Sequence, residues 1–195
     1  MMRKKCDRGT MIQALKFITD EELMQLSSKN PELRFERNAD GTLITMAPTG
    51  QISSNRELKV GAYLFAFVES NNLGEVFSSS GGFRFPNGAV RSPDAAFIAK
   101  DRLPEGWDTG EDKFCSIVPD LVVEIRSKTD SLKMLKEKME EYIENGVKLG
   151  WLIDRAHRQA FVYRGDGSIT QYRENAILSG EEVVPGFTLD LKKLL

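Results

Sequence analysis

Histidine and cysteine are scarce in this chain of 195 residues, which has one histidine, His157, and two cysteines, Cys6 and Cys115. A single histidine excludes metal sites built from histidine clusters and disfavours a histidine-based catalytic triad. Two cysteines this far apart exclude a disulfide framework and a cysteine-type zinc site. Any chemistry must therefore use carboxylates, lysines, arginines or hydroxyls, together with a metal ion that prefers oxygen ligands.

Long hydrophobic runs are also absent. No apolar segment approaches membrane-spanning length, and the positively charged start, MMRKKCDRGT, has no apolar stretch behind it. We therefore expect a cytoplasmic protein without membrane contact. The net charge of −2 argues against a protein that coats nucleic acid nonspecifically, because such a protein would be strongly basic.

The length and the local patterns predict one domain over residues 19–195, preceded by a loose leader at residues 1–18. Thr19 and Glu22 form a capping box that predicts a short helix, and Asp40–Gly41 predicts the turn of an N-terminal hairpin. The segment SSNRELKVGAYLFAFVESNN predicts a long helix. Its apolar residues nearly encircle the axis, so we expect it to be buried on more than one side, with Glu57 near its start on the surface.

The second half of the chain alternates between strands and a helix. Apolar segments predict strands at 94–99, 120–126 and 150–153, and DSLKMLKEKMEEYIENG predicts a helix between the last two. Asp166–Gly167 predicts the turn of a C-terminal hairpin. This order indicates an α/β fold with a mixed β-sheet flanked by helices and an extra hairpin at each end.

A glutamate interrupts the apolar strand PDLVVEIR. Side chains of a strand alternate between its faces, so Glu124 shares a face with Val122 and Arg126. Burying an unpaired carboxylate costs on the order of several kcal/mol, so Glu124 needs a partner. Two interpretations remain open: an internal Glu124–Arg126 pair on a solvated face, or a metal ligand at the end of a core strand.

A second carboxylate, Asp94, follows Pro93 at the start of another predicted strand. Two carboxylates on adjacent strands, together with the backbone carbonyl of Ile125, would supply the oxygen ligands that Mg²⁺ prefers. Such an ion lowers the pKa of bound water and stabilises charge on a phosphate. An aspartate after a proline is also common at turns and strand starts, so spacing alone leaves both roles of Asp94 open.

These residues resemble the PD-(D/E)XK nuclease superfamily. The likeness is carried by Pro93–Asp94 and, thirty residues after Asp94, by Glu124, Ile125 and Arg126. A wider set of segments is similar in order and spacing to a large bacterial family of restriction-endonuclease-like proteins: FERNADGTLITMAPTG, SPDAAFI, PDLVVEIRS, EKMEEYIENGV and GWLID. The resemblance, over residues 19–191, implies a restriction-endonuclease-like core and a metal-dependent endonuclease that hydrolyses DNA phosphodiester bonds.

The resemblance also implies a metal site and an assisting lysine. Asp94, Glu124 and the Ile125 carbonyl would hold Mg²⁺, with Mn²⁺ as an alternative. The superfamily's usual lysine, two residues after the glutamate, is Arg126 here. Members of the bacterial family often carry a lysine on the following helix instead, four residues before a tyrosine, and this position is Lys138. The implied role of Lys138 is to assist the attacking water.

The resemblance implies one further acidic site residue, Glu36. Glu36 shares a predicted strand face with Arg34, so it is equally compatible with a solvent-facing position. A homodimer is expected, because two symmetric sites suit the cutting of both strands of a duplex.

Two other classes of function remain open on the sequence alone. One is a non-catalytic nucleic-acid-binding or regulatory module that retains the nuclease fold, which Arg126 in place of lysine and the acidic charge balance favour. The other is a structural or interaction protein whose acidic face is only solvated. The sequence leaves open the recognition sequence and the choice between DNA and RNA.

Overall fold

The structure is a computed structural model that describes residues 18–46, 48–109 and 113–195. The expected leader lies outside these residues, except for Ile18, which is buried and therefore belongs to the packed domain. The helices are α1 (Asp20–Lys29), α2 (Gln51–Asn71) and α3 (Leu132–Glu144), with short 3₁₀ turns η1 (Lys100–Arg102), η2 (Arg155–His157) and η3 (Leu191–Lys193). No helix in the described ranges is long and apolar enough to cross a membrane.

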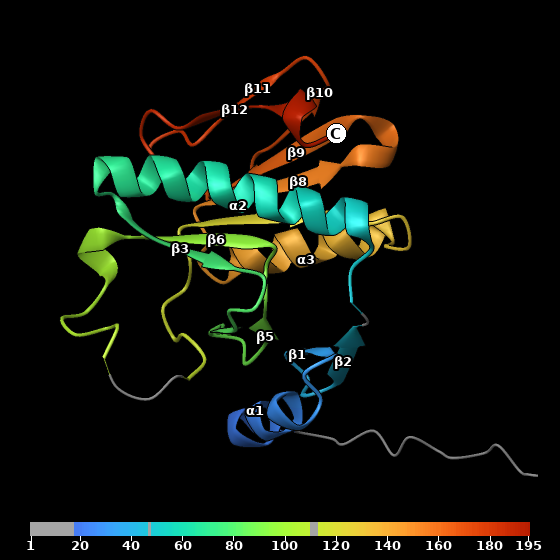
Figure 1. Cartoon of the computed structure of the whole chain (residues 1–195), viewed down its shortest axis with the longest axis vertical. Helices are drawn as coiled ribbons and strands as arrows, with labels where there is room; N and C mark the ends of the chain where they lie inside the picture. The colour runs from blue at the N-terminus through green and yellow to red at the C-terminus, as the bar shows by residue number, and fades with distance from the viewer. Residues whose placement is uncertain (1–17, 47, 110–112) are drawn as a thin grey trace, which may run out of the picture.

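A sheet of six strands forms the centre of the molecule, in the order β10-β9-β8-β7-β6-β3 (Figure 1). Its strands are β3 (Gly74–Ser78), β6 (Ala95–Ala99), β7 (Leu121–Ile125), β8 (Leu149–Asp154), β9 (Gln159–Arg164) and β10 (Ile169–Arg173). β7 and β8 are parallel, and the other pairs are antiparallel. A parallel pair needs a crossover connection, which α3 supplies. The predicted mixed α/β sheet is confirmed.

The alternation of side chains along β7 divides the core into two layers. Leu121, Val123 and Ile125 pack with α2 on one face of the sheet. Val122 packs with α3 on the other face. Glu124 lies on the same face as Val122, so its carboxylate points into the layer between the sheet and α3.

Helix α2 is buried along a single stripe, which corrects the prediction of burial on more than one side. The buried positions are Ser53, Glu57, Val60, Leu64 and Val68. Leu58 and Phe65 lie off this stripe and are 70% and 51% exposed. The apolar residues surround the helix, but its fully buried positions all lie on the stripe that packs on the core.

A second, smaller sheet lies beside α1, below the central sheet in Figure 1, in the order β2-β1-β5-β4. Its strands are β1 (Arg34–Arg37), β2 (Leu43–Met46), β4 (Phe83–Arg84) and β5 (Val90–Arg91). The capping box of α1 and the β1–β2 hairpin are confirmed, with Gly41 in the left-handed conformation at φ 84°. The C-terminal β9–β10 hairpin is also confirmed, and it is followed by a two-stranded sheet of β11 (Ile177–Ser179) and β12 (Thr188–Asp190).

Candidate active site

Asp94, directly before β6, and Glu124 of β7 lie at one end of two neighbouring strands of the central sheet. The antiparallel register pairs Ala95 of β6 with Val123 of β7, so Asp94 and Glu124 occupy the next opposed positions. Asp94 Oδ2 accepts the backbone N–H of Ile125 at 2.7 Å. Both carboxylates line one cavity of about 800 Å³. The structure therefore brings together the two acidic residues singled out in the sequence.

The backbone carbonyl of Ile125 faces the same edge. The N–H of the next residue, Arg126, bonds to Ile153 on β8, so Ile125, one residue earlier, directs its backbone groups toward β6. Continuing the register opposes Ile125 with Pro93. Proline has no N–H, so it offers the Ile125 carbonyl no ladder hydrogen bond. This carbonyl is thus available as a third oxygen ligand.

Burial and repulsion act on the two carboxylates together. Burial raises the pKa of Asp94 well above its usual value, and the nearby carboxylates of Glu124 and Glu57 add to the rise. Burial also raises the pKa of Glu124, an effect that Lys138 opposes. A site that holds two carboxyl groups with raised pKa values gains stability from a cation between them.

Lys138 and Tyr142, one turn apart on α3, both contact Glu124. Lys138 Nζ lies 2.9 Å from Glu124 Oε1, and the Tyr142 hydroxyl donates to the same oxygen at 2.8 Å. Burial alone would lower the pKa of Lys138, but the carboxylates of Glu124 and Glu36 raise it, so the side chain stays an ammonium. The lysine expected from the family resemblance therefore lies beside the glutamate.

Glu36 is buried and holds Lys138 from the other side. Its Oε1 accepts hydrogen bonds from Lys138 Nζ and from the backbone N–H of Ser92, both at 2.9 Å. Burial alone would raise the pKa of Glu36, but Lys138, Ser92 and Arg91 together lower it, so the carboxylate stays charged. Glu36 thus lines the same cavity as Asp94 and Glu124, and it is not solvent-facing.

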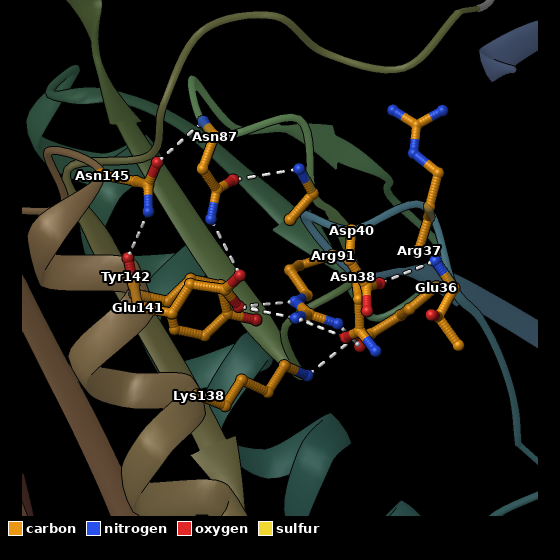
Figure 2. Close-up of polar contacts among 12 residues, drawn as sticks. Glu36, Arg37, Asn38, Asp40, Asn87, Arg91, Lys138, Glu141, Tyr142 and Asn145 are labelled. Carbon is orange, nitrogen blue, oxygen red and sulfur yellow. Dashed lines mark hydrogen bonds and ion pairs between the residues drawn. The ribbon is translucent and has the colours of Figure 1, made fainter. Parts of the chain in front are cut away.

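Arg91 connects the small sheet to α3 (Figure 2). Its guanidinium bonds to Glu141 of α3 at 2.7 Å, to Asn38 at 2.9 Å and to Glu36 Oε2 at 3.4 Å. A buried arginine with three partners fixes the distance between the two elements. The β1 carboxylate and the α3 ammonium are therefore held in one geometry.

Arg126 does not pair with Glu124, so the interpretation of an internal pair is wrong. β7 ends at Ile125, and the Arg126 guanidinium turns to Asp154 at 3.0 Å and to the backbone carbonyl of Asp130 at 3.1 Å. The side chain of Asp154 is fully buried at the end of β8, so this carboxylate needs a cation, and Arg126 provides it.

Glu57 belongs to the site and not to the surface, which corrects the sequence-based expectation. It is 8% exposed, lines the cavity and pairs with Arg34 at 3.5 Å. A signal was present in the sequence, because Glu57 precedes Val60 and Leu64 at helical spacing on the buried stripe of α2. The sequence placed Tyr142 only on the apolar stripe of its helix. It gave no signal that the hydroxyl would contact Glu124, which is 18 residues away.

The donor set fits a hard divalent ion. Over residues 18–46, 48–109 and 113–195, no three histidine, cysteine or carboxylate side chains gather as a metal-binding group. Mg²⁺, however, is often bound through one or two carboxylates and keeps several waters. Asp94, Glu124 and the Ile125 carbonyl supply two carboxylates and one neutral oxygen, which suits this ion.

The fold and the site together define a restriction-endonuclease-like protein. The model of the Uma2 family, described as "Putative restriction endonuclease", matches residues 20–192, and the chain belongs to this family. A crystal structure of "a putative nuclease belonging to DUF820" from Anabaena variabilis is similar, with a TM-score of 0.75 and 22% identity over 91% of this chain and 97% of that chain. A comparison with curated proteins finds no match. The predicted fold and family resemblance are confirmed.

The charge repulsion gives a stability prediction for Asp94→Asn. The folded-state pKa of Asp94 is raised, so ionisation opposes folding, and this penalty develops as the pH rises from the unfolded-state pKa through the folded-state pKa. Asparagine keeps an oxygen for the Ile125 N–H. In EDTA at pH 7.5 the variant should melt at a higher temperature than the parent, by about 2–4 °C for each kcal/mol of relief, and the gain should shrink toward pH 4. Circular dichroism melting curves measure both effects.

Asp40→Asn is the matched control for this prediction. Hydrogen bonds from Thr42 lower the pKa of Asp40, so its charge contributes stability above the unfolded-state pKa, and that contribution is lost as the pH falls through the folded-state pKa. Its amide variant should melt at the same temperature as the parent or slightly lower at pH 7.5. A lower melting temperature for Asp94→Asn at that pH would show that ionisation of Asp94 does not destabilise the folded protein.

Proposed function

We propose that this protein is a Mg²⁺-dependent endonuclease that hydrolyses phosphodiester bonds in DNA. The observation that carries the proposal is the convergence of Asp94, Glu124 and Lys138 in one cavity. The carboxyl groups of Asp94 and Glu124 have raised pKa values, and Lys138 is an ammonium held at a fixed position. The printed description of the Uma2 family supports a nuclease, and the chemistry of the donor set supports a metal-dependent one.

Asp94, Glu124 and the carbonyl of Ile125 would hold the ion, with Mn²⁺ able to replace Mg²⁺. The ion would supply Lewis acidity, which lowers the pKa of a bound water and offsets charge on the phosphate. The Ile125 N–H fixes the orientation of Asp94 by its 2.7 Å hydrogen bond. The Tyr142 hydroxyl does the same for Glu124 at 2.8 Å.

Lys138 contributes a positive charge at a fixed position. Glu36 and Glu124 hold its ammonium from two sides, each at 2.9 Å. An ammonium placed this way orients the attacking water and offsets negative charge that develops on the phosphate. Because Glu36 is tied to Arg91 and to the Ser92 backbone, the ammonium needs little rearrangement when substrate enters.

The alternative of a non-catalytic binding module had two supports in the sequence, Arg126 in place of the usual lysine and the acidic charge balance. The first of these is weakened by the position of Arg126. Arg126 is engaged with Asp154, and Lys138 provides an ammonium beside Glu124. A homodimer with two such sites remains part of the proposal, since it would allow cleavage of both strands.

Covalently closed circular plasmid DNA tests the proposal. Incubation with the protein and Mg²⁺ should convert the supercoiled form to nicked or linear DNA, and EDTA should prevent the conversion. A circle has no ends, so any product identifies an endonuclease. Plasmid that stays supercoiled with both Mg²⁺ and Mn²⁺ would favour the non-catalytic module.

A further inference from the structure

The cations that line the cavity fall into two groups. Three of them are engaged with acidic side chains: Arg34 with Glu57, Arg126 with Asp154, and Lys138 with Glu36 and Glu124. The other two, Lys128 and Arg155, have no acidic partner within salt-bridge distance in the part of the chain that the structure describes. Lys128 is exposed to water, whereas Arg155 is only partly exposed.

Arg155 is held in place but incompletely satisfied. It follows directly after β8, in η2, and its Nη1 donates to Ser53 Oγ of α2 at 3.3 Å. Its Nε is buried and has no hydrogen-bond partner among the described residues. A buried donor without a partner costs about 1–3 kcal/mol, so the contacts within the protein satisfy this guanidinium only in part.

The surroundings of Arg155 suit an anion. The first turn of α2, which supplies Ser53, also lines the cavity and carries no acidic side chain. Glu57, one turn further along α2, also lines the cavity but is paired with Arg34 at 3.5 Å. An anion at the Arg155 guanidinium would meet no carboxylate from the first turn itself, and the positive end of the helix dipole would favour it. Arginine binds phosphate oxygens through paired N–H groups.

Arg155 and Lys138 contact helices on opposite faces of the central sheet. Lys138 lies on α3, and Ser53, the partner of Arg155, lies on α2. These two helices pack on different faces, so the guanidinium and the ammonium approach the cavity from different sides. Within the described residues, Arg155 also makes no hydrogen bond or ion pair with Asp94, Glu124 or Lys138, so it is separate from the group of residues around the proposed ion.

We propose that Arg155, supported by Ser53, is a positioning residue that binds a non-scissile phosphate of the nucleic-acid strand. This inference rests on the proposed function, because it assumes that the cavity receives a phosphodiester strand. The contact would fix the register of the strand over Asp94 and Glu124. It takes no part in bond cleavage.

Salt-dependent DNA binding tests the contact without turnover. The parent for this test carries Glu124→Gln, which blocks cleavage, and its affinity for a fluorescent DNA duplex is measured in EDTA over a range of salt concentrations. Each phosphate contact contributes about 0.9 to the slope of log affinity against log salt. Adding Arg155→Gln should lower the magnitude of the slope by about this amount, and Arg155→Lys should retain most of it because the charge remains.

Arg158→Gln is the matched control. Arg158 lies three residues away, outside the cavity, and pairs with Glu174 on the surface. The same loss of charge there should leave the slope unchanged. If Arg155→Gln and Arg158→Gln have equal slopes while the wild-type protein cleaves plasmid, the Arg155 contact is wrong and the nuclease proposal stands. If the wild-type protein neither binds nor cleaves DNA, both proposals fail.

Discussion

Glu124→Gln should reduce Mg²⁺-dependent DNA cleavage by roughly a thousandfold or more. Loss of one charge-stabilising group typically costs about a hundred- to a thousandfold in turnover, and this substitution also removes half of the carboxylate charge that would hold the ion. Glutamine keeps the size of the side chain and an oxygen that can accept the Tyr142 hydroxyl. The loss should therefore appear in cleavage rates of a protein whose circular dichroism spectrum is unchanged.

Glu137→Gln is the matched control, because it makes the same chemical change at a surface position. Glu137 lies on the exposed side of α3, where it pairs with Lys133 at 3.7 Å, and it does not line the active-site cavity. Its substitution should leave the cleavage rate within about twofold, in keeping with the small energies of surface ion pairs. Full activity in Glu124→Gln would remove this carboxylate from the mechanism.

Lys138→Ala should lower turnover by roughly a hundredfold or more. The substitution removes the only cation that contacts Glu124 among the described residues, and it also leaves Glu36 without its strongest partner. The effect should be larger on kcat than on KM, because the ammonium is expected to act on charge that develops during the reaction. Single-turnover rates with saturating protein measure this step.

Arg126→Ala should cost less activity than Lys138→Ala, and it should also lower stability. The guanidinium contacts buried Asp154, so its removal leaves a buried carboxylate with fewer partners. Arg126→Lys recreates the superfamily's usual spacing, yet the side chain at this position turns toward Asp154. We therefore expect no rescue of Lys138→Ala. A silent Lys138→Ala together with an inactive Arg126→Ala would make Arg126 the working cation.

The sequence was most informative where chemistry is local. The capping box at Thr19, the Asp40–Gly41 and Asp166–Gly167 turns and the apolar strands all depend on neighbours within a few residues, and the structure has them in place. The prediction that Glu124 has a polar partner was also local, since it followed from the alternation of side chains along one strand. It predicted that a partner exists but not which residue it is.

The contacts that complete the candidate site join segments that are distant in the sequence. Lys138 and Glu36 are 102 residues apart, and no periodicity links β1 to α3. The small sheet that contains Glu36 combines two strand pairs that are separated in the sequence: β1 and β2 precede α2, and β4 and β5 follow it. The internal Glu124–Arg126 pair, one of the two interpretations left open by the sequence, is wrong because Arg126 pairs with Asp154 on the neighbouring parallel strand. Only the family resemblance pointed to Lys138 in advance.

The proposed mechanism requires that Asp94 and Glu124 hold a single divalent ion. Crystals soaked in Mn²⁺ test it directly, because anomalous scattering identifies the metal and separates it from water. We predict one strong anomalous peak within coordination distance of both carboxylates and the Ile125 carbonyl, and its absence in Asp94→Asn crystals treated in the same way. Soaked wild-type crystals with no peak between the two carboxylates, or with the ion bound elsewhere in the cavity, would contradict the account.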